Sequence, residues 1–382
     1  MCIICSGNMV KTNKLYIRCD RITEIPNIPS LKKLECFNCR SLVKINALNL
    51  TKLCLIQCPK IEVILNIVSL KSLKINTCEK VNQIYNIKGL NHLECVTCEC
   101  IKSIPKFEFL EMLFICNTSI RIIPNIQSLK ILHFIGSNII LPNITGLKKL
   151  CVERCYDKLI IPNIDNLETL ILISCRDVFM SYISCLKHLS LYDCDNIKHI
   201  YYFNELISLN ILNCPRIKRI PLLPKLETLE LNSCQAISNI PDMSYMKSLT
   251  CINCHHIPHI TGLTSLENLE IHNCKLIKRI SNFKNIESIY VSSLHMLTEL
   301  PDMYIDHLKI INCKWIRGDL EYENNINRLI KLQKWFKKCI FIRRFINIIP
   351  KLIPLFYHPD AHGGYIHKRD MLHCLKYIKK IE

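Results

Sequence analysis

Cysteine is the residue type whose spacing in this chain could carry chemistry. The chain has 25 cysteines among 382 residues, and many of them recur at intervals of about 20 residues. The interval is clearest at Cys78, Cys98, Cys214, Cys234, Cys254 and Cys274. Thiols spaced in this way could bind zinc, form disulfides or occupy one repeated position in a core. The choice among these depends on the elements that position the thiols.

Those elements form a repeat. A leucine or isoleucine opens a short apolar alternation at Leu15, Leu34, Leu53, Leu73, Leu93, Leu113, Leu132, Leu150, Leu170, Leu189, Leu209, Leu229, Leu249, Leu269, Ile289 and Leu308. The averaged unit reads L-x-x-L-x-I-x-x-C-x-x-I-x-x-I-P-x-I. Its L-x-I alternation has the two-residue period of a half-buried strand, and its late proline favours an extended return segment. One unit cannot bury its apolar side chains alone, whereas stacked units can.

This unit resembles the leucine-rich repeat, over roughly residues 15–318. The resemblance implies a β-rich α/β solenoid, a horseshoe with a concave parallel sheet and a mostly extended convex side. The short units are similar to the bacterial effector class of these repeats. With its abundant isoleucine, asparagine and lysine, the array also resembles leucine-rich repeat proteins of giant DNA viruses. That likeness implies host proteins as partners.

The recurrent cysteine falls three residues after the second inward strand position, and we call this position the ladder. We assign to it Cys39, Cys58, Cys78, Cys98, Cys155, Cys175, Cys194, Cys214, Cys234, Cys254, Cys274 and Cys313, with Cys19 and Asn117 filling it in shortened units. Leu294 fills it in one further unit, so the position does not require thiol chemistry. Cysteine is small, tolerates burial and offers a weak S–H donor. We predict reduced ladder thiols, because parallel Cβ vectors disfavour a disulfide between neighbours.

Zinc is the competing interpretation for some of the cysteines. C-x-x-C spacing occurs at Cys36/Cys39, Cys95/Cys98 and Cys251/Cys254. Each of these pairs combines an inward strand position with a ladder position, and a line of thiols does not surround a tetrahedral ion. We therefore expect core thiols there and predict no metal ligands, no catalytic residues and no cofactor.

Two further groups leave a metal open as an alternative. Cys2 and Cys5 lie outside the repeat, where a flexible N-terminal cap is the other interpretation. The second group is His358, Asp360, His362 and His367, in a segment that also reads as a polar turn.

Side chains on the outward side of each strand form a candidate binding surface, which we call the sheet face. Its candidate partner-binding residues are Phe114, Ile135, Ile171, Ile173, Tyr192 and Tyr290. Apolar side chains in a row are uncommon on a monomer without a partner, so they predict a protein-binding face. The alternative is that the isoleucines reflect genomic base composition and have no partner.

A basic tail follows the repeats. Residues 326–382 contain 13 lysines and arginines and 3 acidic residues, which gives about +10 of the chain's +18. Apolar residues recur there at helical intervals before Pro350. This pattern predicts a basic amphipathic helix.

Part of the tail resembles a degenerate IQ motif, the helix that calmodulin-type proteins bind. The candidate tail-binding residues are Leu332, Gln333, Trp335, Phe336, Lys337, Arg343 and Arg344. The match is incomplete, because Ile342 stands where the motif has a basic residue. The open alternatives for residues 326–382 are a calmodulin-like partner, an anionic membrane surface, nucleic acid, or simple packing against the last repeats.

We therefore divide the chain into an N-terminal cap at 1–14, the solenoid at 15–318 and a helical tail at 319–382. Neither a secretory signal nor a long apolar span is evident, so we predict a cytoplasmic protein with reduced thiols.

The predicted function is that of a protein–protein interaction module with an unknown protein partner, and not that of an enzyme. The repeats contain no set of nucleophile, base and orienting group at matching positions. A cysteine-dependent ubiquitin ligase is a further alternative, because Cys339 and Cys374 lie in the tail. The roughly 60 residues after the array are short for such a catalytic domain.

Overall fold

A computed structural model describes Ile4 and residues 12–64, 67–136, 139–280, 283–297 and 307–313, with the side chain of Leu308 left out. The chain divides into two compact units, unit 1 (Met1–Asn196) and unit 2 (Ile197–Glu382). The predictions for Cys2 and Cys5, for the histidines from His358 on and for the whole tail lie outside the described residues. The three-part domain division stays a prediction.

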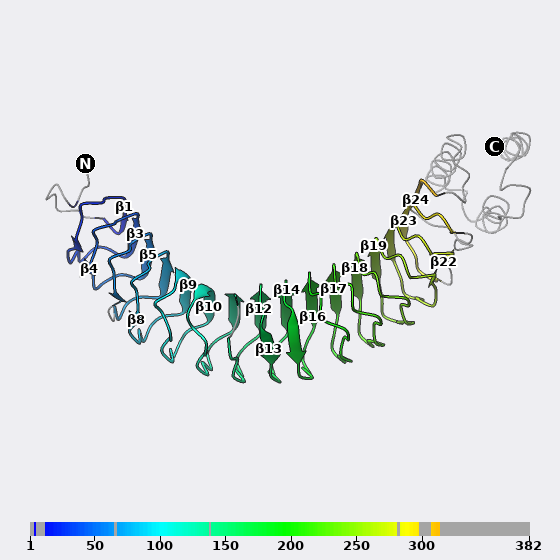
Figure 1. Cartoon of the computed structure of the whole chain (residues 1–382), viewed down its shortest axis with the longest axis horizontal. Coiled ribbons are helices and arrows are strands. Elements are labelled where there is room, and N and C mark those ends of the chain that lie inside the picture. The colour runs from blue at the N-terminus through cyan, green and yellow to red at the C-terminus, as the bar shows by residue number, and fades with distance from the viewer. Residues whose placement is uncertain are drawn as a thin grey trace, which may run out of the picture. The chain divides into compact units, whose positions relative to one another are not determined.

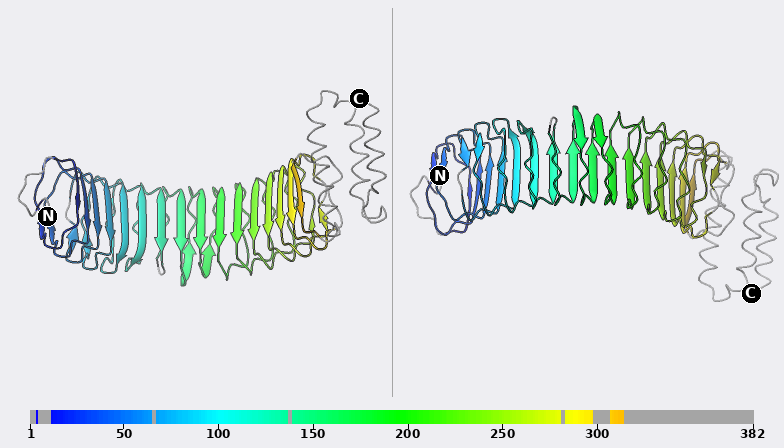
Figure 2. Two further views of the ribbon diagram at one scale, coloured as in Figure 1. Left: turned by 90° about the horizontal axis from the view of Figure 1, so that it is seen from above. Right: turned by 90° about the horizontal axis from the view of Figure 1, so that it is seen from below.

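Unit 1 is built on a parallel sheet with one strand from each repeat (Figures 1 and 2). Its strands are β1 (Lys14–Ile17), β3 (Lys33–Phe37), β5 (Lys52–Ile56), β7 (Ser72–Asn76), β9 (His92–Cys98), β10 (Met112–Thr118), β11 (Ile131–Ile135), β12 (Lys149–Glu153), β14 (Thr169–Ile173) and β16 (His188–Tyr192). The return segments pair more briefly, as β2 (Glu24–Ile25) with β4 (Lys44–Ile45), β6 (Val63–Ile64) with β8 (Gln83–Ile84), and β13 (Lys158–Ile161) with β15 (Asp177–Met180).

Unit 2 repeats the same plan. Its sheet strands are β17 (Ser208–Leu212), β18 (Thr228–Asn232), β19 (Ser248–Ile252), β21 (Asn268–His272), β23 (Ser288–Ser292) and β24 (His307–Ile311). On the return side, β20 (His259–Ile260) pairs with β22 (Arg279–Ile280).

The register confirms the strand alignment read from the sequence. Leu209 pairs with Leu229, and Leu229 with Leu249, so equivalent leucines stack from one turn to the next. Each turn then buries about seven apolar positions. In one turn of unit 2 these are Leu223, Leu226, Leu229, Leu231, Cys234, Ile237 and Ile240, each at most 6% exposed. Full burial of one such side chain stabilises the fold by about 1.5–3 kcal/mol, so each turn depends on its neighbours.

The described residues form strands, bridges, turns and bends, and no helix occurs among them. The described part is thus a parallel β-solenoid with an extended return side, as the leucine-rich resemblance implies. The α component of the predicted α/β class was assigned to the tail and lies outside these residues. No helix in the described part is long and apolar enough to cross a membrane.

A left-handed residue at the end of the sheet strands from β3 on is a feature that the sequence analysis missed. The residue before the ladder position has a positive φ in repeat after repeat, for example Asn38 at 52° and Asn253 at 54°. The backbone N–H of this residue extends the hydrogen bonding of the sheet by one position. The N–H of Asn38, for example, donates to the carbonyl of Ile56 at 2.8 Å. Asparagine tolerates this conformation better than most residues, which explains its frequency there.

Apart from Cys19, the ladder cysteines are buried in the core, as predicted. Cys234 is 0% exposed, and its S–H donates to the carbonyl of Ile211 in the preceding turn at 3.4 Å. Cys98 makes the equivalent contact with the carbonyl of Ile75 at 3.9 Å. Neither Cys98 nor Cys234 is part of a disulfide. Burial raises the pKa of Cys98 to about 11 and that of Cys274 to about 12, so both stay protonated near neutral pH.

The assignment of Asn117 to the ladder was wrong. Its φ is 48° and its side chain is exposed, so it occupies the left-handed turn position. Thr118 is the residue that pairs with ladder Cys98. This unit has 19 residues rather than 20, from Leu113 to Leu132. The sequence assignment therefore fell one residue before the true ladder position. Cys19, from the other shortened unit, is only half-buried.

Candidate functional site

The sheet face of unit 1 brings together five of the six predicted partner-binding residues, but not as a continuous apolar row. In register order, Phe114 is followed by His133, Cys151 and Ile171. The row beside it contains Ile135, Glu153, Ile173 and Tyr192. Apolar side chains therefore surround a group formed by His133, Cys151 and Glu153. Tyr290, the sixth predicted residue, belongs to unit 2.

All six predicted residues are half-buried. Neighbouring side chains on a parallel sheet stand close enough to cover one another, so a face-pointing isoleucine is less exposed than its sequence position suggests. The six residues are apolar or aromatic and lie on the sheet face. Their side chains are less exposed than those of an uncovered row of apolar residues would be.

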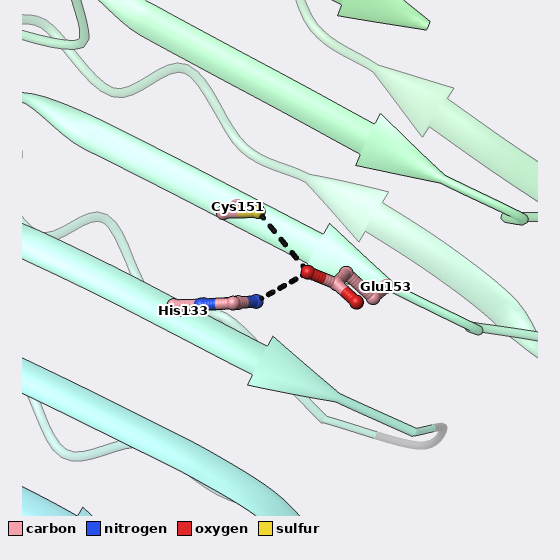
Figure 3. A group of neighbouring side chains, drawn as sticks. All are labelled: His133, Cys151 and Glu153. Carbon is pink, nitrogen blue, oxygen red and sulfur yellow. Dashed lines mark hydrogen bonds and ion pairs between the residues drawn. The ribbon is translucent and has the colours of Figure 1, made fainter. Parts of the chain in front are cut away.

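The group of His133, Cys151 and Glu153, which we call the trio, comes from two adjacent strands (Figure 3). Nε2 of His133 lies 2.8 Å from Oε1 of Glu153, and the S–H of Cys151 points to the same oxygen at 4.0 Å. Cys151 is 8% exposed, and the His133 and Glu153 side chains are 31% and 26% exposed. The ring of Phe114 contacts the imidazole, with 4.6 Å between the centroids.

The local electrostatics keep this thiol protonated. Burial, together with the nearby carboxylate of Glu153, raises the pKa of Cys151 to about 11, although Lys149 acts in the opposite direction. The thiol is therefore a poor nucleophile at neutral pH. Imidazole nitrogen, thiolate sulfur and carboxylate oxygen are all zinc ligands in proteins, so the trio could hold a metal ion.

Unit 2 has a related arrangement around His272. Its Nε2 lies 2.8 Å from Oε1 of Glu270, and its Nδ1 lies 2.7 Å from the hydroxyl of Ser292. The ring of Tyr290 contacts this imidazole at 4.6 Å between centroids, and the Lys309 ammonium lies 4.6 Å from the Tyr290 ring. Both ring nitrogens of His272 thus have polar partners.

The C-x-x-C pairs are core residues, as predicted. Cys36, Cys39, Cys95, Cys98, Cys251 and Cys254 are each 0% exposed. Their sulfurs face the interior of the solenoid rather than a surface that a hydrated ion could reach.

The trio was not predicted as a unit, although its signal is present in the sequence. His133 and Cys151 each follow the first strand leucine of their repeat, and Glu153 stands two residues after Cys151. Aligning the outward positions of neighbouring repeats places the three together. Apolar content, the criterion applied to those positions, does not reveal a polar group of this kind.

A second feature that was missed is an exposed apolar row on the return side of unit 1, which we call the return row. It consists of Ile122, Ile140, Ile160 and Phe179, which are 62%, 64%, 55% and 55% exposed. Ile122 pairs with Ile140, and Ile160 with Phe179. Most equivalent positions elsewhere carry polar residues such as Lys44, Gln83, Arg219 and Arg279, although Val63 occupies one of them.

The fold defines the described part as a parallel β-solenoid with a half-buried, mixed polar and apolar sheet face. No protein-family model and no curated protein matches the sequence. Among solved structures, the chain is similar to a plant peptide hormone receptor, RGFR1, in complex with RGF2. The two are 12% identical with a TM-score of 0.24, and the match covers 80% of this chain and 76% of the receptor chain.

Proposed function

We propose that the protein is a non-enzymatic interaction module whose unit 1 binds a protein or peptide on its sheet face. The observation that carries the proposal is the clustering of Phe114, Ile135, Ile171, Ile173 and Tyr192 around the trio. Aromatic and branched apolar side chains beside a few fixed polar groups are the composition of binding hot spots. The ladder holds the surface rigid, so little conformational entropy is lost on binding.

The finer parts of the proposal follow the resemblance stated above. We place the repeats with the short cysteine-type arrays, such as those of giant DNA viruses, which would make the partner a host protein. We place its action in the cytoplasm, where free thiols persist. Calmodulin-like, membrane or nucleic-acid binding through residues 326–382 is the alternative proposal for the tail.

Selection of peptides from a displayed random library against the full-length chain tests the proposal. We expect selected peptides to lose binding to Ile171→Glu, which puts a charge into the apolar cluster. The matched control is Thr250→Glu, because Thr250 occupies the same repeat position in unit 2. Circular dichroism and the urea midpoint of each variant establish that it is folded.

A third variant, Ile160→Glu, tests the return row. Peptides that lose binding to Ile160→Glu but not to Ile171→Glu would move recognition to the return side and overturn the proposal. Peptides that bind all three variants equally, or that depend on residues 321–382 alone, would overturn it as well.

A further inference from the structure

We propose that His133, Cys151 and Glu153 form a zinc-binding site on the sheet face of unit 1. Their ligand atoms all lie within 4.8 Å of one another. The site does not depend on whether the face binds a protein, and its three donors are drawn together in Figure 3.

The distances fit a tetrahedral ion after small side-chain movements. Zinc bonds of about 2.0–2.3 Å place neighbouring ligand atoms roughly 3.3–3.6 Å apart. The nitrogen–oxygen separation of 2.8 Å would widen slightly, and the sulfur–oxygen separation of 4.0 Å would shorten. Rotations about the side-chain bonds of Glu153 can make both changes. The nitrogen–sulfur separation, which is at most 4.8 Å, is set by rotations of the His133 and Cys151 side chains.

The scaffold under the trio is rigid. β11 and β12 pair along their full length, with Leu132 against Leu150 and His133 against Cys151. Leu132, Phe134, Leu150 and Val152 alternate with the trio and are 0% exposed, so the strands cannot turn over without exposing the core. The Phe114 ring also limits how the imidazole can rotate.

The donor chemistry selects the metal class. A set of one thiolate, one imidazole and one carboxylate suits zinc, whereas magnesium and calcium prefer oxygen ligands alone. The protons balance simply: the zinc ion takes the place of the thiol proton of Cys151, which is released to solvent. The imidazole must carry its remaining proton on Nδ1, so that Nε2 is free to bind the ion.

A bound cation would also neutralise the negative charges of the Cys151 thiolate and the Glu153 carboxylate. The Cys151 sulfur lies 4.0 Å from a carboxylate oxygen of Glu153, so a zinc-bound thiolate and this carboxylate would be neighbouring anions. A divalent cation between the two anions removes the repulsion at its source. Because His133 and Glu153 are partly exposed, the fourth coordination position faces outward, open to water or to an incoming ligand.

The test is a zinc titration of the reduced full-length chain against a chromophoric chelator. The variants are His133→Ala and Cys151→Ser, and the matched control is His272→Ala, which removes the paired histidine of unit 2. Zinc bound by other parts of the chain is common to all four proteins, so the site appears as a difference between them.

We expect the wild type and His272→Ala to bind one zinc ion more than the two trio variants, with affinity at the site reduced on the order of 100-fold or more. Cobalt gives a second readout, because the wild-type spectrum should contain a sulfur-to-cobalt charge-transfer band that is weaker in Cys151→Ser by the contribution of one site. Equal zinc stoichiometry and affinity in all four proteins would overturn the proposal. So would a cobalt–sulfur band of equal intensity in the wild type and in Cys151→Ser, or an equal loss in His272→Ala.

Discussion

Two histidine–carboxylate pairs lie on the sheet face, one in each unit, and they share their contact distances but not their placement on the strands. His133 and Glu153 in unit 1, and His272 and Glu270 in unit 2, are each joined at 2.8 Å. Each imidazole also contacts an aromatic ring at 4.6 Å between centroids. The strands that carry the pairs differ, because His133 and Glu153 lie on β11 and β12, whereas Glu270 and His272 both lie on β21.

The third group distinguishes the two pairs. In unit 2 the hydroxyl of Ser292 partners Nδ1 while Glu270 partners Nε2, so the two partners lie on opposite sides of the ring. In unit 1 the sulfur of Cys151 joins the nitrogen and the carboxylate on one side, within 4.8 Å. A closed hydrogen-bond network and a converging set of metal ligands therefore arise on the same kind of sheet face, depending on which strand carries each side chain.

The largest effect should come from removing the leucines beneath the pairs. Leu150→Ala and Leu269→Ala each leave a cavity in a core position that is 0% and 2% exposed, respectively. We expect each to lower the free energy of unfolding by about 2–5 kcal/mol, measured by urea titration with circular dichroism. Zinc affinity should fall in Leu150→Ala but not in Leu269→Ala. Equal zinc affinities in the two variants would break the comparison.

The aromatic contacts should differ by a smaller amount. Phe114→Ala removes a ring contact worth about 0.5–1.5 kcal/mol. Tyr290→Ala removes an equivalent contact and also the interaction with the Lys309 ammonium, worth about 0.5–1 kcal/mol more. We therefore expect the larger fall in urea midpoint for Tyr290→Ala. In the Lys309→Ala background, Phe114→Ala and Tyr290→Ala should lower the urea midpoint by the same amount. A larger fall in the midpoint for Phe114→Ala than for Tyr290→Ala would contradict this reasoning.

The rate at which Cys151 is alkylated should depend on the neighbouring carboxylate of Glu153. With its pKa raised to about 11, the metal-free thiol reacts slowly at pH 8 and faster as the pH rises towards 11, because only the thiolate attacks. Glu153→Gln removes one cause of the raised pKa, so the rate at fixed pH should increase several-fold. Glu270→Gln is the control and should leave the rate unchanged. Peptide mass spectrometry after iodoacetamide treatment measures the rate at this residue.

The same shift has a consequence for stability. The folded chain holds the Cys151 proton more tightly than the unfolded chain, so the free energy of unfolding must fall as the pH rises from about 8.5 towards the folded value. Glu153→Gln should weaken this fall. A steeper loss of stability at alkaline pH in that variant would have the wrong sign.

The smallest effect is expected from Ser292→Cys. This change puts a thiol beside His272, but at Nδ1, whereas Glu270 stands at Nε2. One imidazole presents a single nitrogen to a given ion, so the three groups do not converge. We expect no additional zinc in the chelator titration. One additional bound zinc ion would mean that the residue types present, rather than their positions around the imidazole, decide zinc binding.

The sequence supports the fold well because the repeat is a local pattern. The alternation Leu229, Glu230, Leu231 predicts one strand and its buried side without knowledge of any neighbour, and the core position of Cys234 follows from the same count. Asn117 marks the limit of this counting. Where a unit is one residue shorter, the sequence does not show whether the missing residue lies before or after the turn. The strand pairing of the structure shows that Thr118, and not Asn117, lies beside Cys98.

What the sequence determined by itself is the solenoid: period, strands, inward thiols and extended return segments, all fixed by side-chain burial within about 20 residues of chain. What only the tertiary structure decided is which outward side chains of different turns meet. The steps from Leu113 to Leu132 and Leu150 are 19 and 18 residues, yet the three remain in register because the return segments absorb the difference. That register places His133 beside Cys151 and Glu153, and strand pairing across turns, rather than spacing along the chain, is its physical cause.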